Sequence, residues 1–507
     1  MFKGTPIMVQ GTHSDAGKSV IVTALCRIFA QDGYRTTPFK SQNMSLNSYI
    51  TSDGKEIGRA QGVQAEAAGV VATTEMNPIL IKPTGDYQSQ IVVNGVPFQN
   101  MKAGEYRQDF YEKGLQLIQE SYSLLKKDYD CIVIEGAGSP AEINLNDREL
   151  VNMRVARLTN APVILVGDIE KGGVFASLVG TLQLLEKADR QRVIGIVINK
   201  FRGDVSLLTP GLSWLEEYTG VPVLGVVPYV ADLNIEAEDS VILDSYTSTR
   251  DSTRELDIAV IRFPFISNFT DIDPFFSEPD CHVRYVQKAE ELGEPDMVVL
   301  PGSKNTLSDL LFLHDSGLAN RIYTLSEQGT AVFGICGGYQ MLGDKVVDEH
   351  GMESSMKVVA GLGLIPAVTF ISKKKTTLLS KGIVTFSQKE LLVEGYELHM
   401  GVTEQKEELS PFIELPGRAE GVQCDNITGT YFHGIFHNDE FREMWLNSLR
   451  VKKGLEPIEN RISFARLREE SFNKLADVVR EHLSLELIYK RMIDFQREES
   501  DKHDSPF

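Results

Sequence analysis

Short, continuous apolar runs alternate with segments of helical periodicity through the first half of the chain. We predict strands at residues 6–11, 34–41, 130–138, 161–169, 192–200 and 221–228. The helical segments between them include residues 18–33 and 106–127. Because the strand-like runs are apolar throughout rather than at every second position, we expect a parallel sheet covered on both faces. This pattern predicts a doubly wound α/β fold, in which ligands bind at the carboxyl ends of the strands.

The composition changes after residue 243, where a polar stretch rich in Ser, Thr and charged residues begins. A second α/β series follows at residues 256–264, 283–287, 295–302, 330–336, 395–401 and 428–436. From residue 439 onward the chain is charged and has helical spacing of its apolar residues. We therefore predict a first domain over residues 1–243, a linker over 244–255, a second domain over 256–447 and a helical C-terminal extension over 448–507.

The overall composition excludes several classes of protein. With 42% apolar and 24% charged residues, the chain of 507 residues has an ordinary globular composition. No apolar run approaches the roughly 20 residues needed to span a bilayer, and the N-terminal residues do not resemble a signal peptide. The five cysteines form no C-x-x-C pair, which favours a reducing cytoplasm over a disulfide scaffold or a zinc site. The formal net charge of −20 disfavours nucleic acid and anionic membranes as partners, so any anionic ligand must be held by a local cluster of N–H groups and Lys or Arg side chains.

Residues 11–19, GTHSDAGKS, follow the first predicted strand and open a predicted helix. A glycine-rich loop in this place presents N–H groups to phosphates, while Lys18 reaches the terminal phosphates and Ser19 offers a hydroxyl to Mg²⁺. Five residues separate Gly11 from Gly17, and this lengthened P-loop resembles that of dethiobiotin synthetase and its relatives. The predicted nucleotide-binding residues of the loop are Gly11, Thr12, Asp15, Gly17, Lys18 and Ser19.

Polar side chains at other strand ends are candidates to complete the nucleotide site. Glu135 ends a buried strand before a Gly-Ala-Gly turn, so its carboxylate is a candidate Mg²⁺ ligand together with Ser19. Lys40 ends another strand, where a second cation could neutralise charge on a transferring phosphoryl group. The resemblance to P-loop folds implies a contact of Asn199 with adenine and a metal-ligating role for Asp53. For Lys40, Asn199 and Asp53, the alternative of polar side chains in solvated loops stays open.

A second candidate site lies at Cys336, where the apolar run 330–335 ends and a helical pattern begins. Glycines two residues before and two residues after Cys336 give the frame of a nucleophile elbow, with sulfur in place of oxygen. Unpaired N–H groups at a helix N-terminus favour a thiolate and can hold an oxyanion. The alternative, a structural cysteine before a glycine-rich loop, does not require glycines on both sides. We therefore predict a nucleophilic cysteine.

A nucleophilic cysteine needs a base and an oxyanion pocket. His433 ends a late predicted strand and is the first candidate for the base, with His399 as its rival. His437 and His13 are weaker candidates. The backbone N–H groups at Gly302 and Gly337 are candidates for the oxyanion pocket.

The segment GICGGYQMLG (334–343) resembles the class I, or triad-type, glutamine amidotransferase domain, which hydrolyses glutamine to deliver ammonia. The resemblance implies that His433 is the base and that Gln340 helps to bind the glutamine side chain. In that family a Glu stands two residues after the His, but this chain has Ile435 there. The orienting carboxylate is therefore absent or comes from elsewhere, and we predict a dyad of Cys336 and His433.

The two halves together resemble the cobyrinic acid amidating enzymes, and among them the cobyric acid synthase family. The motifs that carry the resemblance are KSQNMSLNSYIT (40–51), EIGRAQGVQAEAAG (56–69), MNPILIKP (76–83), EGAGSPAEINLNDRELVNM (135–153), DIEKGGVFASLVGT (168–181), LPGSKNT (300–306) and GICGGYQMLG (334–343). The resemblance implies ATP- and Mg²⁺-dependent amidation of the b, d, e and g carboxylates of adenosylcobyrinic a,c-diamide, through an acyl phosphate and ammonia from glutamine. It makes Asn43, Glu142 and Asp147 candidates to hold the corrinoid, with a plain loop role equally open.

Three alternatives to this function stay open from the sequence alone. The first is the sister enzyme that amidates the a and c carboxylates, which shares both halves. The second is a P-loop ATPase switch with a vestigial glutaminase, and the third is a cysteine peptidase with the same elbow. The sequence does not determine the amidation order, the choice between ATP and GTP, the ammonia route or the oligomeric state, and a homo-oligomer is compatible with it.

Overall fold

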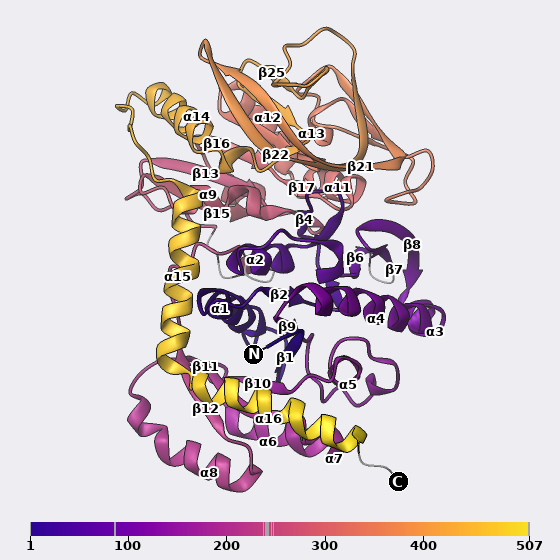
Figure 1. Cartoon of the computed structure of the whole chain (residues 1–507). Helices are drawn as coiled ribbons and strands as arrows, with labels where there is room; N and C mark the ends of the chain where they lie inside the picture. The colour runs from indigo at the N-terminus through magenta and orange to yellow at the C-terminus, as the bar shows by residue number, and fades with distance from the viewer. Residues whose placement is uncertain are drawn as a thin grey trace. The chain divides into compact units, whose positions relative to one another are not determined.

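The computed structural model describes residues 2–85, 88–236, 238, 243–244, 246 and 248–504, with side chains up to residue 498. Contacts within the chain divide it into two compact units. The first unit comprises Met1–Ser45, Glu56–Ile235 and Arg468–Phe507, and the second comprises Leu46–Lys55 and Glu236–Leu467. Figure 1 shows the elements of both units, each of which is described by itself below.

A parallel sheet of six strands forms the centre of the first unit. In order across the sheet the strands are β12 (Val223–Pro228), β11 (Val193–Phe201), β10 (Val163–Asp168), β1 (Thr5–Gly11), β9 (Cys131–Glu135) and β2 (Thr36–Phe39). The central strands β1, β9 and β10 are almost entirely buried, as continuous apolar runs require in a sheet covered on both faces. The main helices that accompany the sheet are α1 (Lys18–Gln31), α2 (Arg59–Ala67), α4 (Tyr111–Asp128), α5 (Met153–Thr159), α6 (Val174–Leu184) and α8 (Thr209–Thr219). The predicted parallel α/β fold of this half is confirmed.

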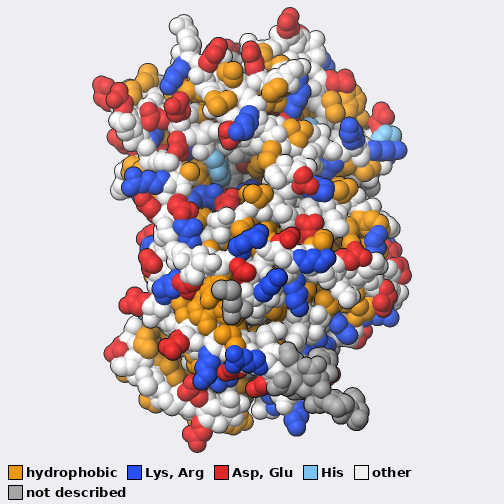
Figure 2. Space-filling view, in the orientation of Figure 1, with side chains coloured by type: hydrophobic (Ala, Val, Ile, Leu, Met, Phe, Trp, Pro, Cys, Tyr) orange, Lys and Arg blue, Asp and Glu red, His pale blue; other side chains and the backbone are white. Residues whose placement is uncertain are grey.

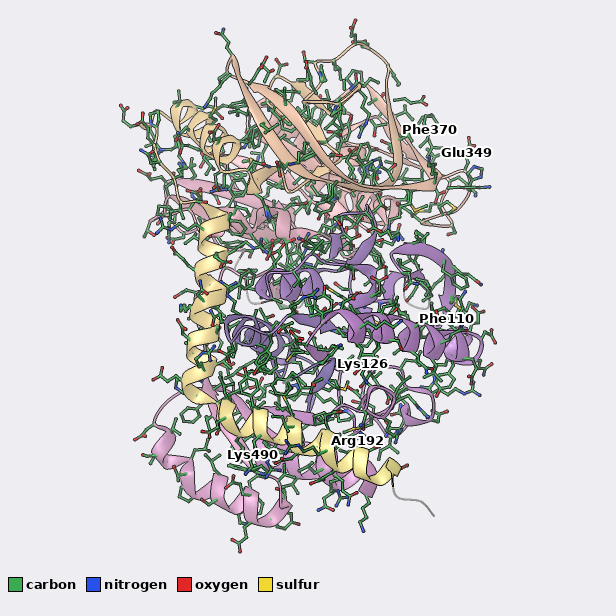
Figure 3. All side chains as sticks on the ribbon, viewed as in Figure 1. Phe110, Lys126, Arg192, Glu349, Phe370 and Lys490 are labelled. Carbon is green, nitrogen blue, oxygen red and sulfur yellow. The ribbon has the colours of Figure 1, made fainter. Side chains whose placement is uncertain are left out.

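A smaller sheet in the first unit was not predicted from the sequence. It consists of β3 (Gln42–Met44), β6 (Ile79–Gly85), β7 (Gln88–Val93) and β8 (Val96–Lys102), of which β6, β7 and β8 are antiparallel neighbours. After β8 the chain enters α3 (Ala103–Asp109) and then α4. Phe110 lies between these two helices (Figure 3), with its ring stacked on that of Tyr106 at a centroid distance of 5.0 Å.

The C-terminal helices belong largely to the core of the first unit. α16 (Leu485–Asp504) follows α15 (Phe464–His482), and Ile488 and Met492 of α16 are buried in the cluster that also holds Ile28 and Phe29 of α1. The Tyr489 ring lies 5.2 Å from the Phe29 ring. In Figure 1 both helices are the yellow end of the chain. The predicted extension 448–507 is thus not one body, because its first residues continue α14 (Asp439–Lys452) in the second unit.

The second unit has its own parallel sheet. Its strands, in order, are β15 (Cys281–Val286), β13 (Leu256–Ile261), β16 (Met297–Leu300), β18 (Ala331–Ile335), β26 (Ile427–Thr430) and β25 (Val422–Cys424), with only the edge strand β25 antiparallel. The helices α11 (Thr306–Asp315), α12 (Leu318–Glu327), α13 (Gly337–Leu342) and α14 accompany it. The predicted α/β character of this half is confirmed as well.

A long hairpin is the main departure from the predicted strand series. β21 (Ala367–Phe386) and β22 (Lys389–Gln405) pair antiparallel along most of their length and turn at Ser387 and Gln388, both with positive φ. The sequence analysis assigned residues 395–401 to the α/β series, but they lie in β22, which pairs with β27 (Phe432–His433). Exposed and buried residues alternate near the hairpin turn, which is the pattern of a sheet with one solvated face.

The predicted linker 244–255 packs on the second unit. Tyr246 stacks on Tyr285 of β15 and on Phe276, with ring centroids 5.6 Å and 4.8 Å away. Residues 245 and 247 of this stretch lie outside the described residues. Within the described part of the chain, no helix combines the length and the apolar character needed to cross a membrane. Acidic and basic side chains are interspersed over the face seen in Figure 2.

Candidate active sites

The glycine-rich loop 11–19 connects β1 to α1 in the first unit. Gly17 has a φ of 92° and precedes the first residue of α1. A Cβ atom at Gly17 would lie 2.0 Å from Nδ2 of Asn199, so only glycine fits. The Asn199 side chain donates to the Ala16 carbonyl at 3.0 Å, which places this residue against the loop. The loop and the end of β11 therefore form one structure.

Lys18 is buried in this loop. Its ammonium group donates to the carbonyl of His13 at 3.0 Å and to that of Gly138 at 3.2 Å. Gly138 belongs to the turn after β9, so the lysine joins two loops at the carboxyl edge of the sheet. A cation held by backbone carbonyls at a helix N-terminus is well placed to bind phosphate oxygens.

Glu135, at the end of β9, is the centre of a hydrogen-bonded cluster. Its Oε1 accepts from the Ser19 hydroxyl at 2.8 Å and from the Lys40 ammonium at 2.9 Å. Its Oε2 accepts from the side-chain amide of Gln64 at 2.5 Å. Ser19, Lys40 and Glu135 were predicted from the sequence, whereas Gln64 was missed. The one feature of the sequence that points to Gln64 is its place in the motif 56–69. A single glutamine in a helix forms no pattern that would predict a functional role.

The donor set fits a hard divalent cation. The Ser19 hydroxyl and the Glu135 carboxylate are oxygen ligands in direct contact, and Mg²⁺ is usually held by one or two carboxylates together with substrate phosphates. Among the described residues, no group of three or more His, Cys, Asp or Glu side chains is arranged to hold a metal ion. Asp53 belongs to the second unit, where its carboxylate accepts from the Thr51 hydroxyl at 2.5 Å and pairs with Lys55 at 2.9 Å. Its role as a metal ligand stays a prediction.

A carboxylate that was not predicted stands at the end of β10. Asp168 pairs with the Lys200 ammonium at 2.9 Å, and the same ammonium donates to the Asp15 carbonyl at 2.7 Å. Burial alone would raise the pKa of Asp168, but the hydrogen bonds from Lys200 and from the Glu170 N–H outweigh burial and lower it. Lys200 and Asp168 thus support the loop at Asp15. Asp168 could have been proposed from the sequence because it ends an apolar strand.

The corrinoid candidates have different surroundings. The Asn43 side chain is buried and donates to Gln61 at 2.9 Å. Asp147 pairs with Arg107 at 2.6 Å, and both it and Glu142 are exposed in the loop after β9. Asn43 is therefore closed off from solvent, whereas the two acidic residues are accessible to a ligand, and the role of all three in corrinoid binding stays a prediction.

In the second unit, Cys336 occupies a strained turn between β18 and α13. Its φ of 52° and ψ of −106° are rare for a residue with a side chain, and such strain is typical of a nucleophile elbow. The glycines of the elbow are required by close packing. A Cβ atom at Gly338 would lie 1.9 Å from the Leu300 carbonyl oxygen, and one at Gly334 would lie 2.8 Å from Gly338. The Cys336 thiol donates to the Leu398 carbonyl at 3.4 Å.

His433, the candidate base, and a carboxylate that can orient it are both buried near this turn. His433 Nδ1 lies 2.7 Å from Oδ2 of Asp271, and the other carboxylate oxygen accepts from the Gly434 N–H at 2.8 Å. Nε2 of His433 has no hydrogen-bond partner among the described residues. Burial alone would lower the pKa of His433, but the nearby Asp271 carboxylate and Cys336 thiol outweigh burial and raise it. Asp271 can therefore orient His433, whereas Ile435 has no carboxylate for this role.

Asp271 comes from a part of the chain remote from His433. It lies in the short 3₁₀ helix Phe269–Ile272, 162 positions before the histidine. Burial would raise the pKa of Asp271, but the charge and the hydrogen bond of His433 outweigh burial and lower it. The sequence feature that could have pointed to Asp271 is the acidic segment after β13. The carboxyl ends of neighbouring parallel strands meet at one edge of the sheet, so this segment can reach the site.

His399, the rival base, makes other contacts. Its ring stacks on Tyr431 at a centroid distance of 3.8 Å, and its Nδ1 lies 2.8 Å from the Gly401 carbonyl. The weaker candidate His437 lies 3.0 Å from the Thr270 carbonyl, and His13 lies in the phosphate loop of the first unit. Of the four histidines, His433 is the one paired with Asp271.

The predicted oxyanion residues lie together. β17 (Gly302–Ser303) pairs with β14 (Ile266–Ser267), and a Cβ atom at Gly302 would lie 3.4 Å from Cε1 of His433. A Cβ atom at Gly337 would lie 2.7 Å from the Ser303 nitrogen. The buried Asp309 supports this turn by accepting from the Ser303 hydroxyl and, at 3.1 Å, from the Phe265 N–H. Gly302 and Gly337 therefore border the space between the thiol and the imidazole.

Gln340 lies one turn after Cys336 and is fixed by its neighbours. Its Oε1 accepts from the Thr306 hydroxyl at 2.8 Å. Its Nε2 lies against Gly401, where a Cβ atom would be 2.1 Å away. The amide is thus held in one orientation beside the elbow.

Comparison with known proteins gives a family match for each half of the chain. Residues 7–242 match the model of the CobQ/CobB/MinD/ParA nucleotide binding domain, and residues 257–441 match that of the CobB/CobQ-like glutamine amidotransferase domain. A cobyric acid synthase from Geobacillus sp. (strain WCH70) is 60% identical over 500 residues, covering 98% of this chain and 99% of that protein. The chain belongs to the cobyric acid synthase family.

Other relatives extend the cobyric acid synthase comparison. A cobyric acid synthase from Anoxybacillus flavithermus (strain DSM 21510 / WK1) is 59% identical over 504 residues, covering 98% of this chain and 99% of that protein. Membership of the cobyric acid synthase family establishes a glutamine-dependent ligase that acts by amidation in cobalamin biosynthesis. Among solved structures, one described as a glutamine amidotransferase is 16% identical with a TM-score of 0.30, covering 38% of this chain and 97% of that one.

A buried carboxyl group near the elbow gives a prediction about stability. Burial raises the pKa of Glu420 to about 7, although the carboxyl accepts from the Thr430 hydroxyl and the Tyr431 N–H. The folded state therefore keeps a proton that the unfolded state releases above pH 4.5, so the free energy of unfolding falls as the pH rises toward 7. The slope for one such group is up to about 1.4 kcal/mol per pH unit.

We expect Glu420→Gln to reduce this pH dependence without removing it, because burial also raises the pKa of Asp309 and of Glu353 to about 7. Urea unfolding midpoints of both proteins at pH 5 and at pH 8 measure the effect. An equal loss of stability between these pH values in both proteins would contradict the assignment to Glu420.

Proposed function

We propose that this enzyme amidates the b, d, e and g carboxylates of adenosylcobyrinic a,c-diamide and so forms adenosylcobyric acid in the cytoplasm. The nitrogen comes from glutamine, and ATP with Mg²⁺ activates each carboxylate. The observation that carries the proposal is the similarity to cobyric acid synthases over the full length of both halves. The contacts of Glu135 in the first unit and of His433 in the second supply the chemistry that such a reaction needs.

Glutamine hydrolysis takes place in the second unit. The Cys336 sulfur attacks the side-chain amide carbon of glutamine, and the N–H groups at Gly302 and Gly337 stabilise the resulting oxyanion. His433 takes the proton of the Cys336 thiol as the S–C bond forms and gives it to the departing nitrogen, and ammonia leaves as the C–N bond breaks. Water then cleaves the thioester, with His433 taking its proton, to release glutamate and the free thiol. Asp271 holds the imidazole in the tautomer that places Nε2 toward the sulfur.

Carboxylate activation takes place in the first unit. A corrinoid carboxylate oxygen attacks the γ-phosphorus of ATP, ADP leaves, and an acyl phosphate results; ammonia then displaces phosphate to give the amide. Lys18 stabilises the charge on the transferring group, and Lys40 assists from the Glu135 cluster. Ser19 and Glu135 would hold Mg²⁺, which would neutralise phosphate charge. Asn199 braces the loop and can contact the base of the nucleotide.

The corrinoid is proposed to meet the loop after β9. Ile143 and Leu145 in that loop have 64% and 42% of their surface exposed, beside Glu142 and Asp147. Apolar side chains next to acidic groups suit a large macrocycle that carries amides as well as carboxylates. Asn43 completes this candidate set through its buried contact with Gln61.

Incubation of adenosylcobyrinic a,c-diamide with enzyme, ATP, Mg²⁺ and glutamine tests the proposal. Mass spectrometry is expected to show successive replacement of four OH groups by NH₂. Cobyrinic acid without amides serves as the second substrate, because amidation that stops at the a and c positions would instead identify the sister enzyme. ATP hydrolysis without any amide product would favour the ATPase switch.

Replacement of Asp271 by asparagine is expected to lower glutamine hydrolysis about 10²- to 10⁴-fold, because the amide can fix the wrong tautomer of His433. Ammonia-driven amidation should be unchanged. Kinetic measurement of glutamate release checks the effect, and Asp273→Asn, two positions away, is the matched control. Equal glutamate release by Asp271→Asn and the wild type would show that Cys336 and His433 act as a dyad.

A further inference from the structure

Residues 46–55 belong to the second unit, although the residues on both sides of them belong to the first. They include β4 (Ser48–Ile50), and Ser48 and Ile50 are buried. This short segment belongs to the half of the sequence that contains the phosphate loop. Its residue Ile50 follows Lys40 by ten positions. The placement raises the question of what the segment does in the glutaminase unit.

Ile50 packs on one face of β22. It forms a separate buried cluster with Tyr396 and Leu398, which are two positions apart and so point to the same side of the strand. The Tyr396 ring stacks on the His433 imidazole with centroids 4.9 Å apart and planes 13° apart. The Leu398 carbonyl accepts from the Cys336 thiol. The neighbours of Ile50 therefore touch both the nucleophile and the base.

Ser48 contacts the third member of the site by a different path. Its backbone N–H donates to the side chain of Asn268 at 2.9 Å, and both residues are buried. Asn268 has a φ of 50° and begins the 3₁₀ helix that carries Asp271. A hydrogen bond at this position fixes the start of the helix and hence the place of the carboxylate.

We propose that residues 46–55 are a positioning segment of the glutaminase site, in which Ile50 holds Tyr396 and Leu398 and Ser48 holds Asn268. The inference rests on the proposed catalytic roles of Cys336, His433 and Asp271. The segment touches a neighbour of each of these three residues but none of the reacting atoms. A catalytic arrangement needs its groups held to within a fraction of an ångström, and this packing supplies part of that constraint. The phosphate-loop half of the sequence thereby contributes to the glutamine half.

Ile50→Ala in the full chain tests the proposal. The kcat of glutamine hydrolysis is expected to fall about 10- to 100-fold with little change in KM, because the His433 stack and the Leu398 carbonyl lose their support. The pH profile of kcat/KM should shift, since His433 would no longer be held against Asp271 in the same way. Ammonia-driven amidation should be unchanged, and Ile50→Val should recover most of the glutaminase rate.

Two further variants separate positioning from general stability. Ile322→Ala removes an equally buried isoleucine from α12 of the same unit, and its glutaminase rate should be unchanged. Asn268→Gly removes the acceptor of the Ser48 N–H at a residue whose φ suits glycine, and it should lower kcat, whereas Asn268→Asp should keep it. The comparison of Asn268→Gly with Asn268→Asp also tests the positioning role if Ile50→Ala does not fold.

An unchanged glutaminase kcat in Ile50→Ala and Asn268→Gly would overturn the proposal. So would an equal fall in glutamine-driven and ammonia-driven amidation, because that result indicates general unfolding. Cys336→Ala, assayed in parallel, distinguishes the two levels of inference. If Cys336→Ala still hydrolyses glutamine, the proposed catalytic roles fail, whatever Ile50 does.

Discussion

Cys336→Ala is expected to abolish glutamine-dependent amidation while ammonium salts still support amide formation. The alanine lacks the sulfur that attacks the glutamine amide, and none of the other four cysteines in the described part of the chain lies in an elbow between a strand and a helix. Loss of a catalytic nucleophile costs about 10⁴-fold or more in rate. Carboxylate activation depends on the phosphate loop of the first unit and needs no thiol. Glutamate release and amide formation, measured with each nitrogen source, give the two rates.

The substitution should leave the fold intact, because alanine is smaller than cysteine and the lost hydrogen bond to the Leu398 carbonyl is weak. Cys424→Ala is the matched control, since Cys424 is a free cysteine of the same unit outside the elbow. It should keep both activities. Loss of the ammonia-driven reaction in Cys336→Ala alone would contradict two separate sites in one chain.

The parallel sheets were predictable because their signal is local. Strands β1, β9 and β10 each contain a continuous apolar run, and short runs of this kind bounded by turn residues are typical of strands buried on both faces. The hairpin of β21 and β22 was not predicted. Its pairing joins residues on both sides of a turn, and its lysine-rich stretch 373–375 masks the alternation of apolar positions. Pairing of this kind depends on contacts that one strand does not encode by itself.

The candidate sites divide in the same way. The phosphate loop and the elbow at Cys336 are continuous in sequence, and their glycines are required by close backbone approaches that leave no room for a Cβ atom. Asp271 reaches His433 from a remote segment, so a search beside the histidine found only Ile435. Gln64 and Ile50 are similar cases, because each gains its importance from one tertiary contact. The reactive residues could be predicted where a site is built from a continuous stretch of sequence. The residues that support them could not be predicted, because they come from distant parts of the chain.

Lys18→Ala is expected to stop amidation with either nitrogen source. The ammonium group of Lys18 bridges the phosphate loop and the turn after β9, where the terminal phosphates of a bound nucleotide would lie. Removing it takes away the charge that stabilises the transferring phosphoryl group and leaves the His13 and Gly138 carbonyls without this donor. We expect a fall of about 10³-fold or more in amide formation. Amide product, followed by mass spectrometry with glutamine and then with ammonium, measures it.

The two nitrogen sources make this result specific. Because Lys18 belongs to the first unit and Cys336 to the second, glutamate release by Lys18→Ala should persist when amide formation has stopped. Lys187→Ala removes an exposed lysine from α7 (Lys187–Arg190) of the same unit and should amidate at the normal rate. Amide formation by Lys18→Ala at the wild-type rate would exclude the phosphate-loop role. In the expected outcome, Cys336→Ala and Lys18→Ala fail in opposite halves of the reaction, since one lacks the nitrogen and the other lacks the activated carboxylate.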